Sequence, residues 1–142
     1  MLRFPALFAV LALSLTPALA QETAPTTPTL ALELNALQAA DTGCRVTFLA
    51  TNTLGAAVDR AGIEIAFFAG DGAIDRIVTL DFKGLTEGKT KVLQFQLNDL
   101  ACDDISRLLV NDITACEGTG LAPTACLGGL VTTTRPDILF GV

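Results

Sequence analysis

The stretch from Cys44 to Cys116 constrains the fold of this chain more than any other part of the sequence. Apolar and polar residues alternate along most of it, and turns that bear glycine or asparagine interrupt the alternation. Period-two alternation is typical of strands with one buried face, and strands joined by such turns form antiparallel sheets. Three of the four cysteines lie in this stretch. The sequence therefore predicts a disulfide-bonded β-domain, although this pattern indicates no substrate.

The alternation places five strands in the first two thirds of the chain. We predict them over residues 30–35, 44–51, 63–67, 74–82 and 93–97. The turn between the third and fourth contains Asp71-Gly72, a strong hairpin signal. In the second and fourth strands the residues expected to face the core are Cys44, Val46, Phe48 and Ala50, then Ile74, Val78, Leu80 and Phe82.

The last third of the chain is less regular. Residues 98–113 fit a helix capped by Asp103 and Asp104, or a turn at these aspartates followed by a strand that runs to Cys116. We favour the turn and strand, because disulfide-flanked β-domains often close in this way. A final strand is expected over 127–134, and the tail RPDILFGV has no predicted partner. About seven short strands predict an all-β fold, an immunoglobulin-like sandwich of antiparallel strands, with an open barrel as the alternative.

The amino-terminal residues predict an exported protein. Arg3, the apolar run LFAVLALSL and Ala18-Leu19-Ala20 form a secretory signal peptide over 1–20. Residues 21–29, with Pro25 and Pro28, form a flexible leader, and 30–142 form a single domain. We therefore expect a periplasmic or secreted protein with no membrane span after cleavage of the signal.

Four cysteines in an exported chain predict two disulfides, which can pair in three ways. We predict Cys116–Cys126, because this pair closes a short loop that contains Gly118, Gly120 and Pro123, and Cys44–Cys102 then follows. Zinc is disfavoured, because the chain has no C-x-x-C spacing and no histidine.

Three short motifs lie between Val46 and Leu97: Thr51-Asn52-Thr53, Phe67-Phe68-Ala69-Gly70-Asp71-Gly72 and Leu85-Thr86-Glu87-Gly88-Lys89. In this combination the region resembles the FxLYD-type immunoglobulin-like extracytoplasmic domains of bacteria. Phe67-Phe68-Ala69 stands where that family has its Leu-Tyr-Asp signature. The resemblance implies an immunoglobulin-like sandwich and assigns no role. The chain also resembles short secreted proteins of Gram-negative bacteria, from which no activity follows.

Composition argues against several functions. Without Arg3, eight basic residues face fifteen acidic ones, and a net charge of −7 disfavours nucleic-acid binding. The absence of histidine excludes Ser-His and Cys-His catalysis, and Ser106 is the only serine after residue 20. With neither Trp nor Tyr, the chain cannot build the aromatic platforms of a sugar-cleaving cleft. We therefore expect no enzyme and no cofactor.

Carboxylates are the remaining candidates for chemistry. Asp99, Asp103 and Asp104 cluster in one turn and are weak candidates for a calcium site, although their spacing does not match an EF-hand loop. Capping of the turn is the simpler interpretation. We expect a non-catalytic module that binds a protein of the cell envelope through a strand edge or loop face, or has a structural role there. The alternative is a calcium- or sugar-binding module, or an unfamiliar enzyme, that uses the aspartate turns. The sequence does not predict the oligomeric state.

Overall fold

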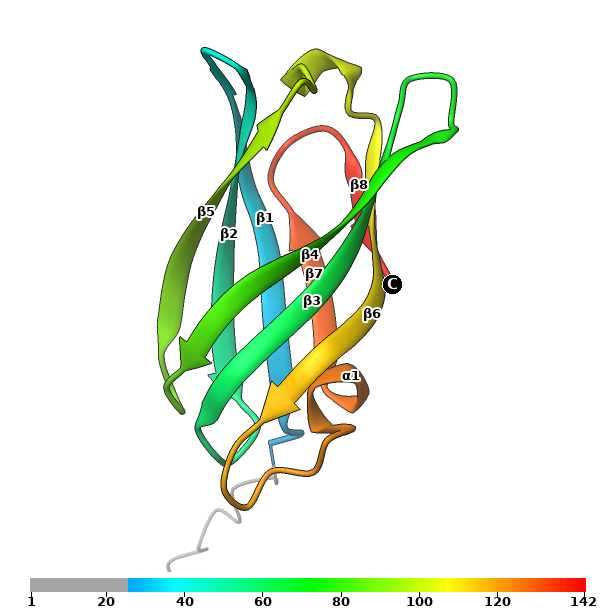
Figure 1. The fold of residues 1–142 in the computed structure, drawn as a ribbon. Coiled ribbons are helices and arrows are strands. Elements are labelled where there is room, and N and C mark those ends of the chain that lie inside the picture. Colours follow the sequence, from blue (N-terminus) through cyan, green and yellow to red (C-terminus); the bar gives the residue numbers. More distant parts are fainter. Residues whose placement is uncertain (1–25) are drawn as a thin grey trace, which may run out of the picture.

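The computed structural model describes residues 26–142, which form two packed four-stranded sheets (Figure 1). Sheet A contains, in order, β5 (Thr90–Asn98), β2 (Gly43–Thr53), β1 (Thr29–Ala40) and β7 (Leu130–Thr134). Sheet B contains β4 (Ile74–Leu85), β3 (Val58–Phe68), β6 (Arg107–Glu117) and β8 (Leu139–Gly141). The predicted all-β sandwich is confirmed. The predicted signal peptide lies outside the described residues, as do residues 21–25 of the leader.

The first six strands follow the immunoglobulin order. β1, β2, β3, β4, β5 and β6 take the places of strands A, B, C, C′, E and F, with A, B and E in one sheet and C′, C and F in the other. The last two strands differ from the predicted antiparallel arrangement, because β7 pairs with β1 and β8 pairs with β6 in parallel. The connection between β7 and β8 crosses from sheet A to sheet B (Figure 1).

Phenylalanines from both sheets fill the centre of the core. The ring of Phe48 lies 5.6 Å from those of Phe82 and Phe140 and 6.1 Å from that of Phe95. Pairs of this kind contribute about 1 kcal/mol each beyond the burial of their area. In β2 the predicted inward residues Cys44, Val46, Phe48 and Ala50 are all fully buried.

The prediction that Ile74 faces the core is wrong. Ile74 lies on the outer surface, with 53% of its area exposed. The reason is a bulge at the start of β4: Phe67 pairs with Arg76, but Phe68 pairs with Ile74, so Asp75 is an extra residue. Because side chains alternate in a strand, the extra residue turns Ile74 outward, while Arg76 stays on the same inward side as Val78.

The carboxy-terminal third also differs in part from the prediction. In the ambiguous segment, the 3-10 turn η1 (Cys102–Asp104) precedes β6, so the favoured strand is confirmed and the helix is wrong. The strand expected over 127–134 begins only at Leu130, because α1 (Ala125–Gly128) occupies the preceding residues. The tail does have a partner: β8 pairs with β6 and buries Phe140.

The structure contains the two disulfides in the predicted pairing. Cys44–Cys102 joins the start of β2 to η1, and Cys116–Cys126 joins the end of β6 to α1. Both are compatible with an oxidising compartment outside the cytoplasm. Within residues 26–142 no helix has the length and apolar character needed to cross a membrane.

A buried asparagine ties together the two turns at the lower end of the sandwich. The side-chain nitrogen of Asn52 donates to the carbonyls of Ala56 and Leu85, each at 2.9 Å, and its oxygen accepts the N–H of Leu54 at 3.0 Å. The backbone carbonyl of Asn52 also accepts the N–H of Gly88 at 2.7 Å. Asn52 therefore links the β2–β3 loop to the β4–β5 turn, and its side chain is fully buried.

Candidate functional site

The aspartates predicted as weak metal ligands lie in a turn that backbone hydrogen bonds hold in place. The N–H of Asp99 donates to the carbonyl of Thr42 at 2.7 Å, and the N–H of Asp104 donates to that of Ala101 at 3.0 Å. The side chains of Asp99, Asp103 and Asp104 are exposed. Among residues 26–142 no group of three or more metal-binding side chains comes together, and these three aspartates form none.

Asp71 and Asp75 have local roles as well. Asp71 Oδ1 accepts the N–H of Ala73 at 3.0 Å, which closes the β3–β4 hairpin. Asp75 Oδ2 lies 2.6 Å from Nε of Arg76. The two aspartates thus stabilise the hairpin and the adjacent bulge.

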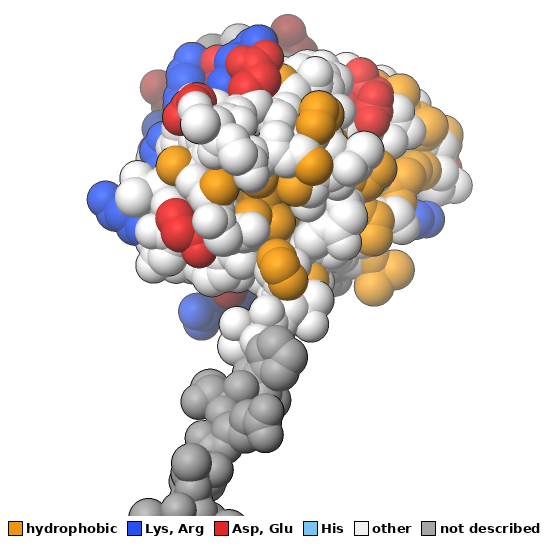
Figure 2. All heavy atoms as spheres, turned by 90° about the horizontal axis from the view of Figure 1, so that it is seen from below, with side chains coloured by type: hydrophobic (Ala, Val, Ile, Leu, Met, Phe, Trp, Pro, Cys, Tyr) orange, Lys and Arg blue, Asp and Glu red, His pale blue; other side chains and the backbone are white. Residues whose placement is uncertain are grey.

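The hollows in the described surface are shallow and lined largely by backbone and small side chains. One of about 370 Å³ lies between the β1–β2 turn and the β5–β6 loop, and Asp99, Asp103 and Cys102 line part of it. Another, of about 440 Å³, lies between Pro28, Leu54 and α1. Figure 2 shows this lower end of the molecule, where hydrophobic side chains alternate with polar ones. Neither hollow contains a histidine or a free thiol, since the chain has no histidine and both disulfides are formed.

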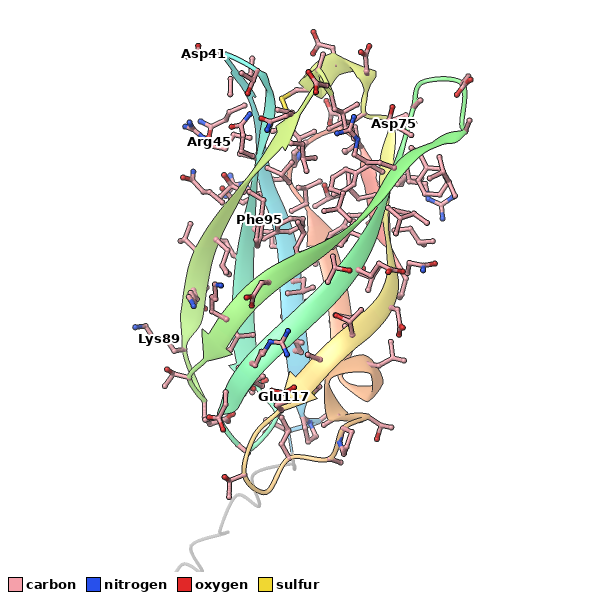
Figure 3. All side chains as sticks on the ribbon, in the orientation of Figure 1. Asp41, Arg45, Asp75, Lys89, Phe95 and Glu117 are labelled. Atoms are coloured by element: carbon pink, nitrogen blue, oxygen red, sulfur yellow. A yellow bond between two sulfur atoms is a disulfide. The ribbon has the colours of Figure 1, made fainter. Side chains whose placement is uncertain are left out.

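Two basic side chains cover the side of the sandwich where the edge strands β4 and β5 meet. Lys91 points inward from β5, and its Nζ donates to the carbonyls of Gly84 at 3.0 Å and Phe82 at 3.4 Å. Arg76 points inward from β4 and donates to the carbonyls of Asn98 at 2.7 Å and Asp99 at 3.2 Å. Between them the ring of Phe95, from β5 (Figure 3), lies 5.3 Å from that of Phe82 in β4. Inward-pointing charges protect edge strands from pairing with other chains.

The outer face of sheet B carries outward-facing apolar side chains in two adjacent rows across the strands. The first row runs from Ile74 in β4 through Phe68 and Arg107 to Leu139 in β8. The second runs from Ile77 through Ala66 and Leu109 to Gly141. We call the apolar residues of these rows the apolar face: Ala66, Phe68, Ile74, Ile77, Leu109 and Leu139.

The side chains of the apolar face are open to solvent at its ends and packed at its centre. Ile74, Ile77 and Leu139 are 53%, 50% and 71% exposed. Ala66 is only 1% exposed although it points away from the core, because Ile77 and Leu109 flank it. The guanidinium of Arg107 stacks 5.0 Å from the centre of the Phe68 ring. The four strands span about 14 Å at the usual spacing, and Arg107 interrupts the first row between Phe68 and Leu139.

Charges replace apolar residues on the lower half of the same sheet. Nζ of Lys83 lies 2.7 Å from Asp81 Oδ2, and Arg60 lies 3.4 Å from Glu117. The hydrogen bond from the Lys83 side chain, followed by that from its backbone N–H, lowers the pKa of Asp81. These pairs are solvated and contribute little to stability.

Two acidic residues lie at the boundary between these halves. Glu64 and Asp112 are register partners in the row directly below the apolar face. Glu64 accepts a hydrogen bond from Asn111 at 2.5 Å, and Asp112 accepts the N–H of Ile113 at 2.8 Å. Neither carboxylate belongs to one of the ion pairs formed among residues 26–142.

Comparison with protein-family models, with curated proteins and with solved structures gives no match to this chain. The resemblance to FxLYD-type domains therefore stays a prediction.

Sequence reasoning missed the apolar face, although a signal for it was present. Each strand of sheet B contains adjacent apolar residues at this level: Phe67-Phe68, Ile77-Val78, Leu108-Leu109 and Leu139-Phe140. Because neighbouring side chains in a strand point to opposite faces, one residue of each pair has to face outward. Four such pairs in one sheet indicate a sheet that is apolar on both sides.

Proposed function

We propose that this chain is an exported, non-catalytic module that binds a protein partner in the cell envelope through the apolar face of sheet B. The observation that carries this proposal is the alignment of outward-facing apolar side chains on four adjacent strands, exposed on the edge strands β4 and β8 and partly buried on β3 and β6. Contiguous exposed apolar patches are uncommon on proteins that act alone, and they mark sites of interaction. The rows of Ile74 and Ile77 form such a patch.

The arrangement of the edges favours a face over a strand edge as the binding surface. Lys91 and Arg76 occupy the exposed carbonyls beside β4 and β5. The opposite edges are short, with five residues in β7 and three in β8. Short or charge-protected edges are poor templates for an added strand. The patch would form the centre of an interface of ordinary size, with polar residues around it.

Export is supported by the signal-peptide pattern over residues 1–20 and by the two disulfides. We propose the periplasm or the exterior of the cell as the place of action, in agreement with the resemblance to bacterial extracytoplasmic domains. A non-catalytic role is supported by the lack of histidine and by the hydrogen bond that the Asp71 carboxylate accepts within its own turn.

Site-specific photo-crosslinking in cells tests this function. A photoreactive phenylalanine analogue is placed at position 77, or at Val92 as a matched control on the outer face of sheet A, where the side chain is 62% exposed. We expect a discrete crosslinked protein from position 77 and none from position 92. Equal yields from both positions, or no crosslink from position 77, would contradict the proposal.

A further inference from the structure

We infer that the protein partner carries basic residues along the side of its contact surface that meets Glu64 and Asp112. This inference deepens the proposed function and rests on it. It concerns the chemistry of the partner rather than the location of the site.

The two carboxylates lie next to the apolar face. Glu64 lies two residues before Ala66 in β3, and Asp112 is its register partner in β6. In a strand, residues two apart point to the same face and lie about 7 Å from one another. Glu64 therefore borders the apolar face directly, within the area that a partner seated on it would cover.

Among residues 26–142 neither Glu64 nor Asp112 forms an ion pair with a lysine or an arginine. Among the described residues the ion pairs use Asp75, Asp81 and Glu117, with Arg76, Lys83 and Arg60 as their partners. The Arg107 guanidinium in the first row stacks on Phe68. Each carboxylate accepts one hydrogen bond from a neutral donor, which leaves its charge uncompensated. A partner that covers Glu64 and Asp112 therefore has to bring positive charge, because a covered charge without an opposite charge is strongly destabilising.

The charge of the chain disfavours a second copy of the chain as the partner. The chain carries fifteen acidic and nine basic residues in total. Self-association through this face would bring two such acidic borders into one interface and add repulsion between two negative molecules. A protein with lysine or arginine beside an apolar centre complements both features of the surface.

The crosslinking assay at position 77 tests this inference when it is repeated in cell lysate at controlled salt with charge-neutralising variants. Glu64→Gln with Asp112→Asn removes two negative charges and retains the oxygens that accept the hydrogen bonds of Asn111 and Ile113. Asp41→Asn with Asp59→Asn removes the same charge at exposed positions away from the face; Asp41 lies at the tip of the β1–β2 turn (Figure 3). Thermal unfolding of both double variants checks that each is folded.

We expect the first double variant to lower the crosslinking yield about fivefold at low salt, and the control to leave it unchanged. Raising the ionic strength should weaken the native interaction and reduce the difference. A yield that is the same in all three proteins would overturn the basic partner and leave the proposed function in place. A crosslinked product of twice the monomer mass would also overturn it, since the occupant would be a second copy. The absence of any crosslink from the native sequence would overturn both.

Discussion

Asn52 and the apolar face depart in opposite directions from the usual distribution of polar and apolar residues. Asn52 is an amide with no exposed surface, whereas Ile74, Ile77 and Leu139 are large apolar side chains left in water. The chain itself accounts for Asn52, because its side chain makes three hydrogen bonds to the backbone of two turns. Nothing within residues 26–142 covers the apolar face in a comparable way.

This difference separates scaffold from function. A buried polar group that satisfies all its hydrogen bonds specifies the structure and needs no ligand. An aligned set of exposed apolar side chains adds little to the stability of the folded chain and gains free energy only when another surface covers it. Substitutions at Asn52 should therefore change stability, and substitutions on the apolar face should change binding.

The largest effect is expected at Asn52. Asn52→Ala leaves the carbonyls of Ala56 and Leu85 and the N–H of Leu54 without their partner in a buried position, so we expect a loss of about 3 kcal/mol in unfolding free energy. Asn98→Ala is the matched control, because the exposed Asn98 accepts a single side-chain hydrogen bond from Thr42, and about 0.5 kcal/mol should be lost. Denaturant unfolding measures both. Similar losses would show that Asn52 does not organise the lower turns.

A smaller effect is expected where Lys91 and Arg76 cover the edges of β4 and β5. Replacing both by valine removes four charged donor contacts to backbone carbonyls, and we expect a loss of about 2 kcal/mol. The uncovered edges should also promote association, seen as increased light scattering after partial heating.

Lys89→Val provides the control for that pair, since Lys89 is exposed in the β4–β5 turn (Figure 3). It should change neither stability nor scattering by a measurable amount. If the Lys91 and Arg76 double variant scatters no more light than the native protein, these charges do not protect the edges. Binding of a partner through a strand edge would then regain support.

The smallest effect is expected at Asp81. Lys83 lowers the pKa of this carboxyl in the folded protein below its ordinary value of 3.8, so the charged form stabilises the fold above that pH. The contribution disappears as the pH falls through the lowered folded-state pKa. Asp81→Asn should therefore lower the melting temperature slightly at about pH 7 and not at about pH 2. An equal difference at both pH values would show that the charge is not the cause.

The core strands could be predicted from the sequence because alternation determines which side of a strand is buried. Leu93, Phe95 and Leu97 in β5 illustrate this, since each alternates with a polar residue and each packs against the core. The disulfide pairing could be predicted as well, because a short glycine-containing loop suits Cys116–Cys126. Both inferences depend on residues that lie close together in the sequence.

The orientation of Ile74, the partner of the tail and the apolar face could not be predicted, because they depend on strand pairing between distant parts of the chain. The outward position of Ile74 follows from one extra residue opposite Phe67-Phe68, and the partner of the tail follows from the crossing of β7 to β8. The apolar face exists only because the register aligns apolar pairs from the β3–β4 hairpin with pairs from β6 and β8, which lie much later in the chain. Its residues were visible in the sequence, but their alignment was not.

The most direct test of the central claim is the dissociation constant for the protein captured from position 77, measured with Ile77→Arg and with Val92→Arg. The long arginine stem can still cover Ala66, so both variants should remain within about 0.5 kcal/mol of the native stability. We expect binding about tenfold weaker for Ile77→Arg and unchanged for Val92→Arg. Native affinity in Ile77→Arg, or equal weakening in both variants, would contradict that claim.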